Sequence, residues 1–365
     1  MSLPTARAEE AGLSPRRLAL ADDHVQRGHE EEVYTAAVLL VARGGRIAHQ
    51  RAFGTLAPDG PPARTDSLFD LASLTKPHTA AAVLTLVEDG RVSLAGEVAE
   101  WIPETKGTPL ASLTLRQLAT HTSGLPAWRP LYRSGNRQAM LAEILATPLQ
   151  NPPGTRSVYS DLGYILLGEV VARASGMPLD QYLHSRILAP LGMKDTGFLP
   201  APTRRSRIAA TANSRNRPDQ RIVGEVHDEN AHAFGGVAGH AGLFGTAGDL
   251  AILASALATD GEIGGHRVFG LPTLRLIRTS QVEPGVGGHS IGWFTPPNPM
   301  LPRGDLLPDT TFGHTGFTGT MVVVEPASQL VVILLTNRVI NPADGTGIAR
   351  VRRRVLNAVA SAIVR

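Results

Sequence analysis

The stretch LASLTKPHTA, residues 71–80, decides the expected fold, because the pattern of the sequence changes there. Before it, AAVLLVARGGRIAHQRAFG (residues 36–54) reads as two strands joined by a tight turn at Gly44 and Gly45. After it, from about residue 78 to residue 285, helical patterns follow one another between loops rich in proline and glycine. Strand patterns return only near the end, in HSIGWFTP (289–296), TGTMVVVEP (318–326) and QLVVILLTN (329–337).

Strands at both ends of the chain, with helices between them, predict one antiparallel sheet that both ends build together. The expected fold class is α/β: an antiparallel β-sheet flanked by helices, with a large, mainly helical insertion. We expect residues 1–77 and 286–365 to form the sheet domain and residues 78–285 to form the helical domain. The active site is expected between these two parts.

The composition narrows the classes of function. Apolar residues make up 42% of the chain and charged residues 18%, which is typical of a globular protein. The net charge is only +3 and no basic run is interleaved with aromatic residues, so we expect no nucleic-acid partner. The chain has no cysteine, which excludes disulfides, zinc sites built from thiolates and a cysteine nucleophile.

The sequence shows no sign of a membrane span. No apolar run approaches the roughly 20 residues that a spanning helix requires. The start of the chain, MSLPTARAEEAGLSPRR, lacks the apolar core of a leader peptide. We therefore expect a cytoplasmic location, and the alternative of a removed signal peptide stays open.

Ser73 and Lys76 are the first candidates for chemistry. They lie three residues apart at the start of an apolar helical pattern, and the chain contains few other lysines. Positions i and i+3 share one face of a helix, so the lysine amine can lie beside the serine hydroxyl. A serine hydroxyl is a weak nucleophile until a neighbouring base removes its proton. Taken alone, the pair could still be a coincidence of spacing.

Two further segments carry polar groups at the ends of apolar elements. SVYSDLGYILLGEV (157–170) places Tyr159 and Asp161 at the start of a predicted helix. TFGHTGFTGT (311–320) places His314, Thr315 and Gly316 at the edge of a strand, where small residues let a ligand approach the backbone. Each segment also has an ordinary explanation, as a helix entry, a helix cap or a strand-end turn.

Together, and in this order, the three segments resemble the motifs of the penicillin-recognising serine hydrolases. That superfamily includes class C β-lactamases, D-alanyl-D-alanine carboxypeptidases and β-lactamase-like esterases. Its motifs are S-x-x-K, then Y-x-N, then K-T-G or H-T-G. RQLATHTSGLP (116–126) and GGVAGHAGLFGTAGDLA (235–251) are similar to further segments of these proteins, so the resemblance covers nearly the whole chain.

The resemblance implies a catalytic role for each matched residue. Ser73 would be the nucleophile that forms an acyl-enzyme. Tyr159 would be the general base, with its phenol pKa lowered by the neighbouring Lys76 ammonium. The backbone N–H groups of Ser73 and Phe317 would form the oxyanion hole. No cofactor and no metal are implied.

The matched positions Asp161, His314, Thr315 and Gly316 would bind the substrate, but two of them depart from the pattern. Asp161 stands where β-lactamases and D-alanyl peptidases usually have asparagine, and His314 stands where β-lactamases usually have lysine. An ionised aspartate cannot donate a hydrogen bond to an acylamide carbonyl, and it would pair with Lys76. A neutral histidine would hold a substrate carboxylate less strongly than a lysine.

These departures favour a serine hydrolase that acts on small acyl esters. The alternatives are a β-lactamase or D-alanyl-D-alanine carboxypeptidase and, in another class, a non-catalytic penicillin-binding or partner-binding module. The expected partner is a small-molecule ester or acyl substrate.

The remaining histidines are expected to be structural. VHDENAHAFGGVAGH (226–240) contains residue types that bind metals, but its spacing is not that of a known ligand set such as H-E-x-x-H. We expect His227, Asp228, Glu229, His232 and His240 to form hydrogen bonds that stabilise a loop. His121 is expected to form structural hydrogen bonds near the pocket.

Overall fold

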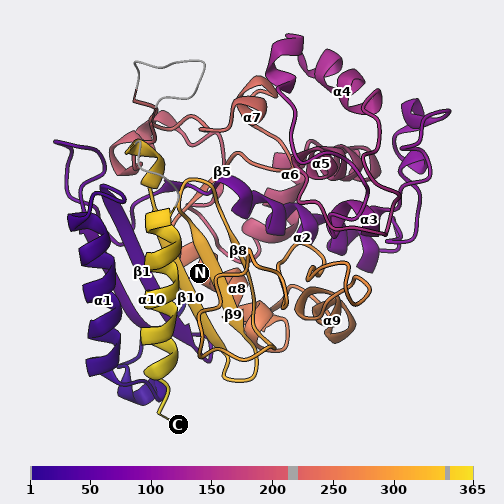
Figure 1. The fold of residues 1–365 in the computed structure, drawn as a ribbon. Helices are drawn as coiled ribbons and strands as arrows, with labels where there is room; N and C mark the ends of the chain where they lie inside the picture. Colours follow the sequence, from indigo (N-terminus) through magenta and orange to yellow (C-terminus); the bar gives the residue numbers. More distant parts are fainter. Residues whose placement is uncertain (1, 213–220, 342–345, 365) are drawn as a thin grey trace.

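The computed structural model describes residues 2–212, 221–341 and 346–364 (Figure 1). At its centre lies a five-stranded antiparallel sheet with the order β2-β1-β10-β9-β8. An N-terminal hairpin supplies β1 (Ala36–Arg43) and β2 (Arg46–Gly54). The C-terminal part supplies β8 (Phe312–Thr315), β9 (Met321–Glu325) and β10 (Leu330–Thr336). The predicted antiparallel α/β architecture is confirmed.

The central strands β1 and β10 are apolar throughout because both faces of the sheet are covered. Alternate residues of β1 enter two different cores. Leu39 and Val41 pack with α1 (Pro15–Glu30) and α10 (Thr346–Ser361), which lie side by side on one face (Figure 1). Val38 and Leu40 belong to the larger core, which includes α8 (Ala247–Ala258) and the helical region.

The helical patterns predicted between residues 78 and 285 form helices. They are α2 (Thr75–Glu88), α3 (Leu115–Ala119), α4 (Arg137–Leu145), α5 (Asp161–Ser175), α6 (Leu179–Leu183), α8 and α9 (Leu271–Arg278). The short helix α7 (Glu229–Ala233) lies in the segment 226–240, where the sequence predicts a loop. Helix α8 lies within the range predicted for the helical domain, yet it packs on β1, β9 and β10. The division into two domains stays a prediction. In the ranges that the structure describes, no helix has the length and apolar character needed to cross a bilayer.

Short strands complete the helical region. β3 (Phe69–Asp70), β5 (Leu243–Gly245) and β4 (Gly197–Phe198) form a second sheet in the order β3-β5-β4. β6 (Glu262–Ile263) and β7 (His266–Arg267) form a separate hairpin. The second sheet matters for function, because β3 leads directly into the segment that carries Ser73.

The strand predicted at residues 289–296 is wrong. Only isolated bridges occur there, between His289 and Phe294 and between Phe294 and Gly313. Gly292 has a φ of 88°, and a Cβ at this position would lie 2.5 Å from the Cβ of Ala80. The chain therefore turns tightly against α2, and β8 takes the third C-terminal place in the sheet.

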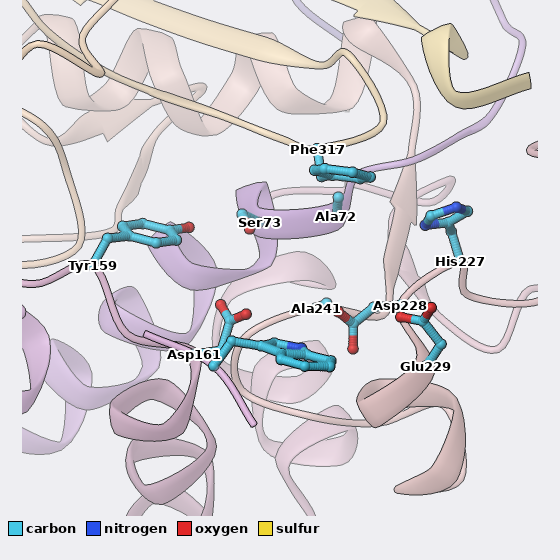
Figure 2. A pocket seen from close by; sticks show the side chains of 10 residues that line it. Ala72, Ser73, Tyr159, Asp161, His227, Asp228, Glu229, Ala241 and Phe317 are labelled. Atoms are coloured by element: carbon cyan, nitrogen blue, oxygen red, sulfur yellow. The ribbon is translucent and has the colours of Figure 1, made fainter. Parts of the chain in front are cut away.

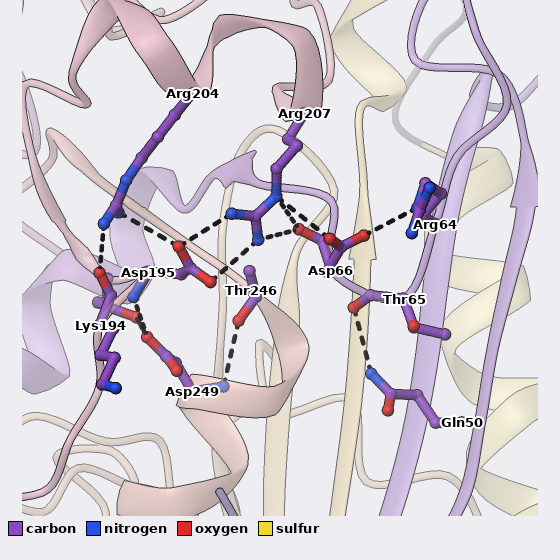
Figure 3. Close-up of polar contacts among 11 residues, drawn as sticks. Gln50, Arg64, Thr65, Asp66, Lys194, Asp195, Arg204, Arg207, Thr246 and Asp249 are labelled. Atoms are coloured by element: carbon purple, nitrogen blue, oxygen red, sulfur yellow. Dashed lines mark hydrogen bonds and ion pairs between the residues drawn. The ribbon is translucent and has the colours of Figure 1, made fainter. Parts of the chain in front are cut away.

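A network of arginines and carboxylates fixes the segment that precedes β3 (Figure 3). The guanidinium of Arg207 donates to the backbone carbonyl of Asp66 and to both carboxylate oxygens of Asp195. Asp249, in the first turn of α8, accepts from the backbone N–H of Asp195 at 2.7 Å. The network thus connects the approach to Ser73 with a helix that packs on the main sheet. Of the surface loop predicted at 204–221, residues 213–220 lie outside the described residues.

Candidate active site

Ser73 lies in the short 3-10 helix Ala72–Leu74, where β3 passes into α2. Ala72, just before it, has a φ of 47°, a left-handed conformation that is costly for a residue with a Cβ. The buried carboxylate of Asp70 accepts the N–H of Ala72 at 2.8 Å and the N–H of His227 at 2.7 Å. One side chain therefore holds both the strained turn and the loop facing it.

Lys76 is fully buried, and its ammonium group lies among several hydrogen-bond acceptors. Its Nζ lies 2.9 Å from Ser73 Oγ, 3.2 Å from the carbonyl oxygen of His240 and 2.7 Å from Asp161 Oδ1. Burial by itself lowers the pKa of Lys76, but the Asp161 carboxylate and the neighbouring Tyr159 together more than offset this, so the pKa lies above its ordinary value. The predicted pairing of Asp161 with Lys76 is confirmed, and the lysine stays charged.

Tyr159 is buried beside this ammonium, with Nζ of Lys76 4.6 Å from the centroid of its ring. Its hydroxyl points toward Ser73 (Figure 2). Burial raises the pKa of the Tyr159 phenol, and the Lys76 charge, which lowers it, does not compensate. The expectation of a lowered phenol pKa is therefore wrong. The phenol is protonated in the resting site, and this limits what it can do as a base.

His121 fixes the backbone on both sides of Tyr159. Its Nδ1 accepts the N–H of Ser160 at 2.9 Å, and its carbonyl accepts the N–H of Val158 at 2.8 Å. The imidazole ring also packs against the Tyr159 ring, with 4.5 Å between the centroids. The predicted structural role of His121 is confirmed, and its effect is to orient the tyrosine.

Four buried histidines make stability depend on pH. Burial lowers the pKa of His78, His121, His289 and His314 below the ordinary value of 6.5, that of His289 to about 4. In the unfolded chain these groups titrate near 6.5, so below that pH the unfolded state binds protons that the folded state does not. Their contribution to stability is complete above pH 6.5 and is lost as the pH falls.

We expect the free energy of unfolding to fall between pH 6.5 and 5 by up to about 1.4 kcal/mol per histidine and pH unit. Urea unfolding at pH 8, 7, 6 and 5 measures this dependence. In the variant His289→Gln, the free energy of unfolding should fall less steeply with falling pH, by about the contribution of one histidine. If the difference in unfolding free energy between this variant and the wild type does not change with pH, His289 does not contribute to the pH dependence.

A cavity of about 350 Å³ opens beside Ser73 (Figure 2). The predicted site residues Ser73, Tyr159, Asp161 and Phe317 line it. The other residues of the lining are Ala72, Trp128, His227, Asp228, Glu229 and Ala241. The predicted sheet domain and the predicted helical domain both contribute to this lining, as the expected position between them requires.

The H-T-G segment lies next to the cavity rather than in its wall. The side chain of His314 is buried and stacks on Phe294 with 4.2 Å between the ring centroids. Neither it nor Thr315 nor Gly316 is part of the lining. A Cβ on Gly316 would lie 2.6 Å from the carbonyl oxygen of Leu71, so glycine is needed for close packing there. Substrate binding by these three residues stays a prediction.

Two threonine hydroxyls attach the loop after β8 to the segment that leads from β3 to Ser73. Thr318 donates to the carbonyl of Asp70 at 2.7 Å, and Thr320 donates to the carbonyl of Leu71 at 3.0 Å. Phe317 lies in this loop and borders the cavity opposite Asp161 (Figure 2). Among the described residues, neither the N–H of Ser73 nor the N–H of Phe317 has a backbone or side-chain acceptor. Both groups are free to bind an oxyanion.

One group of side chains has the residue types of a metal site. Ligand atoms of Asp161, Asp228 and His240 lie within 4.8 Å of one another. However, Asp161 already pairs with the Lys76 ammonium, and His240 Nε2 lies 2.9 Å from Asp228 Oδ1. The buried ammonium already neutralises Asp161 and would repel a divalent cation. The arrangement fits an organic acid–base site better than a metal centre.

Comparisons with known proteins agree with this geometry. The protein-family model described as Beta-lactamase matches residues 21–357. The protein named "Putative D-alanyl-D-alanine carboxypeptidase" of Escherichia coli strain K12 is 32% identical over 373 residues, which cover 92% of this chain and 85% of the relative. The solved structure of EstCE1, a hydrolase with promiscuous acyltransferase activity, has a TM-score of 0.79 at 22% identity and covers 94% of this chain and 99% of its own. A class C beta-lactamase has a TM-score of 0.77 at 20% identity, with coverage of 94% and 96%.

Proposed function

The chain belongs to the beta-lactamase family of serine hydrolases, and from this premise we propose that it hydrolyses small acyl esters through an acyl-enzyme on Ser73. The observation that carries the proposal is the ion pair of 2.7 Å between Asp161 and Lys76, which borders the cavity beside Ser73. It places an acceptor, with no hydrogen to donate, where the acylamide carbonyl of a penicillin or a peptide would need a donor.

Acylation can proceed without an ionised tyrosine. As Ser73 Oγ attacks the ester carbonyl, its proton passes to the Tyr159 oxygen, and the phenol proton passes to the departing alkoxide. The tyrosine therefore ends the step neutral, as its raised pKa requires. Lys76 keeps its charge and positions Ser73, while the N–H groups of Ser73 and Phe317 stabilise the negative oxygen of the tetrahedral intermediate. Water then releases the acyl group by the reverse relay.

The charges of the lining support esters over carboxylate-bearing substrates. The lining contains three acidic residues and neither arginine nor lysine. A β-lactam or a peptide ending in D-alanine brings a carboxylate, which such a wall would repel. A simple ester brings none.

A second candidate is a D-alanyl-D-alanine carboxypeptidase, because that activity is printed in the name of the Escherichia coli relative. Ser73, Lys76 and Tyr159 would serve either reaction. A D-alanyl peptide would bring an acylamide carbonyl close to Asp161, whereas a simple ester would not. Substitution of Asp161 therefore distinguishes the two candidates.

We expect the wild-type protein to hydrolyse p-nitrophenyl butyrate faster than a chromogenic cephalosporin or a D-alanyl-D-alanine peptide at matched concentrations. Asp161→Asn should raise the ratio of β-lactam acylation to ester acylation by about tenfold, because the amide supplies a donor worth about 1.4 kcal/mol. Stopped-flow acylation rates measure both. Asp180→Asn, in the first turn of α6, is the matched control. Faster turnover of the cephalosporin or the peptide by the wild type would sink the esterase proposal.

A further inference from the structure

The active-site cavity carries an excess of negative charge. Asp161, Asp228 and Glu229 border it, and their side chains gather on the wall opposite Phe317 (Figure 2). Lys76 lies behind this wall and neutralises Asp161. Within the part of the chain that the structure describes, neither Asp228 nor Glu229 pairs with a lysine or an arginine, and Asp228 faces the imidazole of His240.

Asp228 is ionised and held in place. Its Oδ1 accepts the backbone N–H of Ala231 at 2.7 Å and faces His240 Nε2 at 2.9 Å. Although burial raises the pKa of Asp228, the interactions with His240 and with Ala231 lower it further, to about 2. At neutral pH this carboxylate offers fixed negative charge to whatever enters the cavity.

Glu229 is the carboxylate most available to a ligand. It is partly buried at the first position of α7, and no ion pair or hydrogen bond of its side chain occurs within residues 2–212, 221–341 and 346–364. Asp228 and Glu229 come from one loop, so they present their charges to the cavity side by side (Figure 2). The backbone of that loop is fixed to the nucleophile turn by the bond between His227 and Asp70.

Aromatic rings complete the wall. Trp128 and Phe317 border the same cavity, and both are exposed, by 38% and 63%. The guanidinium carbon of Arg338 lies 4.5 Å from the centroid of the Phe317 ring, and Arg338 is not part of the lining. Aromatic faces beside carboxylates are the surroundings in which proteins bind ammonium groups.

We propose that the pocket selects ester substrates that carry a positively charged ammonium group, which binds to Glu229 and Asp228 between the aromatic rings. The inference rests on the proposed esterase function and names the substrate class of that same site. It also explains why a catalytic site with a buried lysine has so acidic a wall: the acidic pair serves the substrate, while Asp161 serves the lysine.

The experiment compares esters that have the same shape and differ only in charge. Acetylcholine and 3,3-dimethylbutyl acetate test the alcohol side. The p-nitrophenyl esters of 4-(trimethylammonio)butyrate and 5,5-dimethylhexanoate test the acyl side. The trimethylammonium charge is permanent, so the charge difference within each pair does not depend on pH. We expect kcat/KM to favour the cationic member of at least one pair by about tenfold or more, and high salt to reduce this preference.

Glu229→Gln should lower that preference about fivefold or more, whereas Glu225→Gln, on the same loop but outside the lining, should leave it unchanged. The inference is overturned if the ratio of kcat/KM for the cationic ester to that for the neutral ester is one or less in both pairs. It is also overturned if Glu229→Gln does not alter this ratio. Equilibrium binding of the same esters to the Ser73→Ala variant separates the two proposals. If no ester is turned over, the esterase proposal fails, while the binding preference still decides whether the pocket selects cations.

Discussion

Replacing Ser73 by alanine should lower kcat/KM for the preferred ester by about 10⁴-fold or more, because no other group can form the acyl-enzyme. The thermal midpoint should hardly change. The lost hydroxyl borders an open cavity, where water can accept the hydrogen bond from Lys76 instead. Steady-state rates, differential scanning fluorimetry and mass spectrometry after treatment with a fluorophosphonate measure the three consequences.

The matched control is Ser361→Ala, which removes a hydroxyl from the end of α10, far from the cavity in sequence and outside its lining. It should keep both activity and labelling. Residual turnover by Ser73→Ala within tenfold of the wild type, or fluorophosphonate labelling at another residue, would show that the chemistry lies elsewhere.

Tyr159→Phe and Lys76→Met should each lower kcat/KM by about 10³-fold, and the double variant should lose little more than either single variant. In the proposed mechanism the tyrosine relays a proton only while the ammonium holds the Ser73 hydroxyl beside it, so we expect the pair to act as one unit. Methionine roughly preserves the volume of the buried lysine. Acylation rates of the four proteins complete the cycle.

Lys76→Met also leaves the Asp161 carboxylate without its partner, and breaking a buried ion pair is costly. The variant Lys76→Met/Asp161→Asn removes that cost and should recover stability without recovering activity. If the fold-losses of kcat/KM in the two single variants multiply in the double variant, Tyr159 and Lys76 act independently and not as one unit. Activity that returns together with stability would show that Lys76 is needed only for folding.

The parts of the fold that follow from sequence are those fixed by apolar periodicity. β1 and β10 are long apolar runs because two cores enclose them, and the hairpin at Gly44 and Gly45 follows from its turn residues. The false strand at residues 289–296 shows the limit of such reasoning. Its apolar residues suggest a buried strand, but Gly292, with a positive φ, lies against Ala80 of α2, so the chain turns there.

The site divides in the same way. The proximity of Ser73 and Lys76 follows from their spacing on one helix face, whereas the place of Tyr159 beside them follows only from the resemblance to the penicillin-recognising hydrolases. Trp128 lies in a loop and Glu229 begins the short helix α7, in segments without apolar periodicity, and tertiary contacts such as the bond from His227 to Asp70 bring the segment of Glu229 to Ser73. In the sequence, the run of three titratable residues at 227–229 indicates this part of the cavity wall, although from the sequence alone we assign these residues to hydrogen bonds that stabilise a loop. The phenol pKa of Tyr159 depends on burial, which no local pattern reports.

The strand order has a consequence for biosynthesis. Leu39 of β1 pairs with Leu334 of β10, so one edge of the first strand stays open until nearly the whole chain has left the ribosome. At about 5–20 residues per second, that edge waits roughly 15–60 s for its partner. An unpaired, apolar edge is a template for aggregation, so this interval is the time when a chaperone would protect the nascent chain. The catalytic pocket also lacks Phe317 until then, so truncated chains should carry the nucleophile but no complete active site.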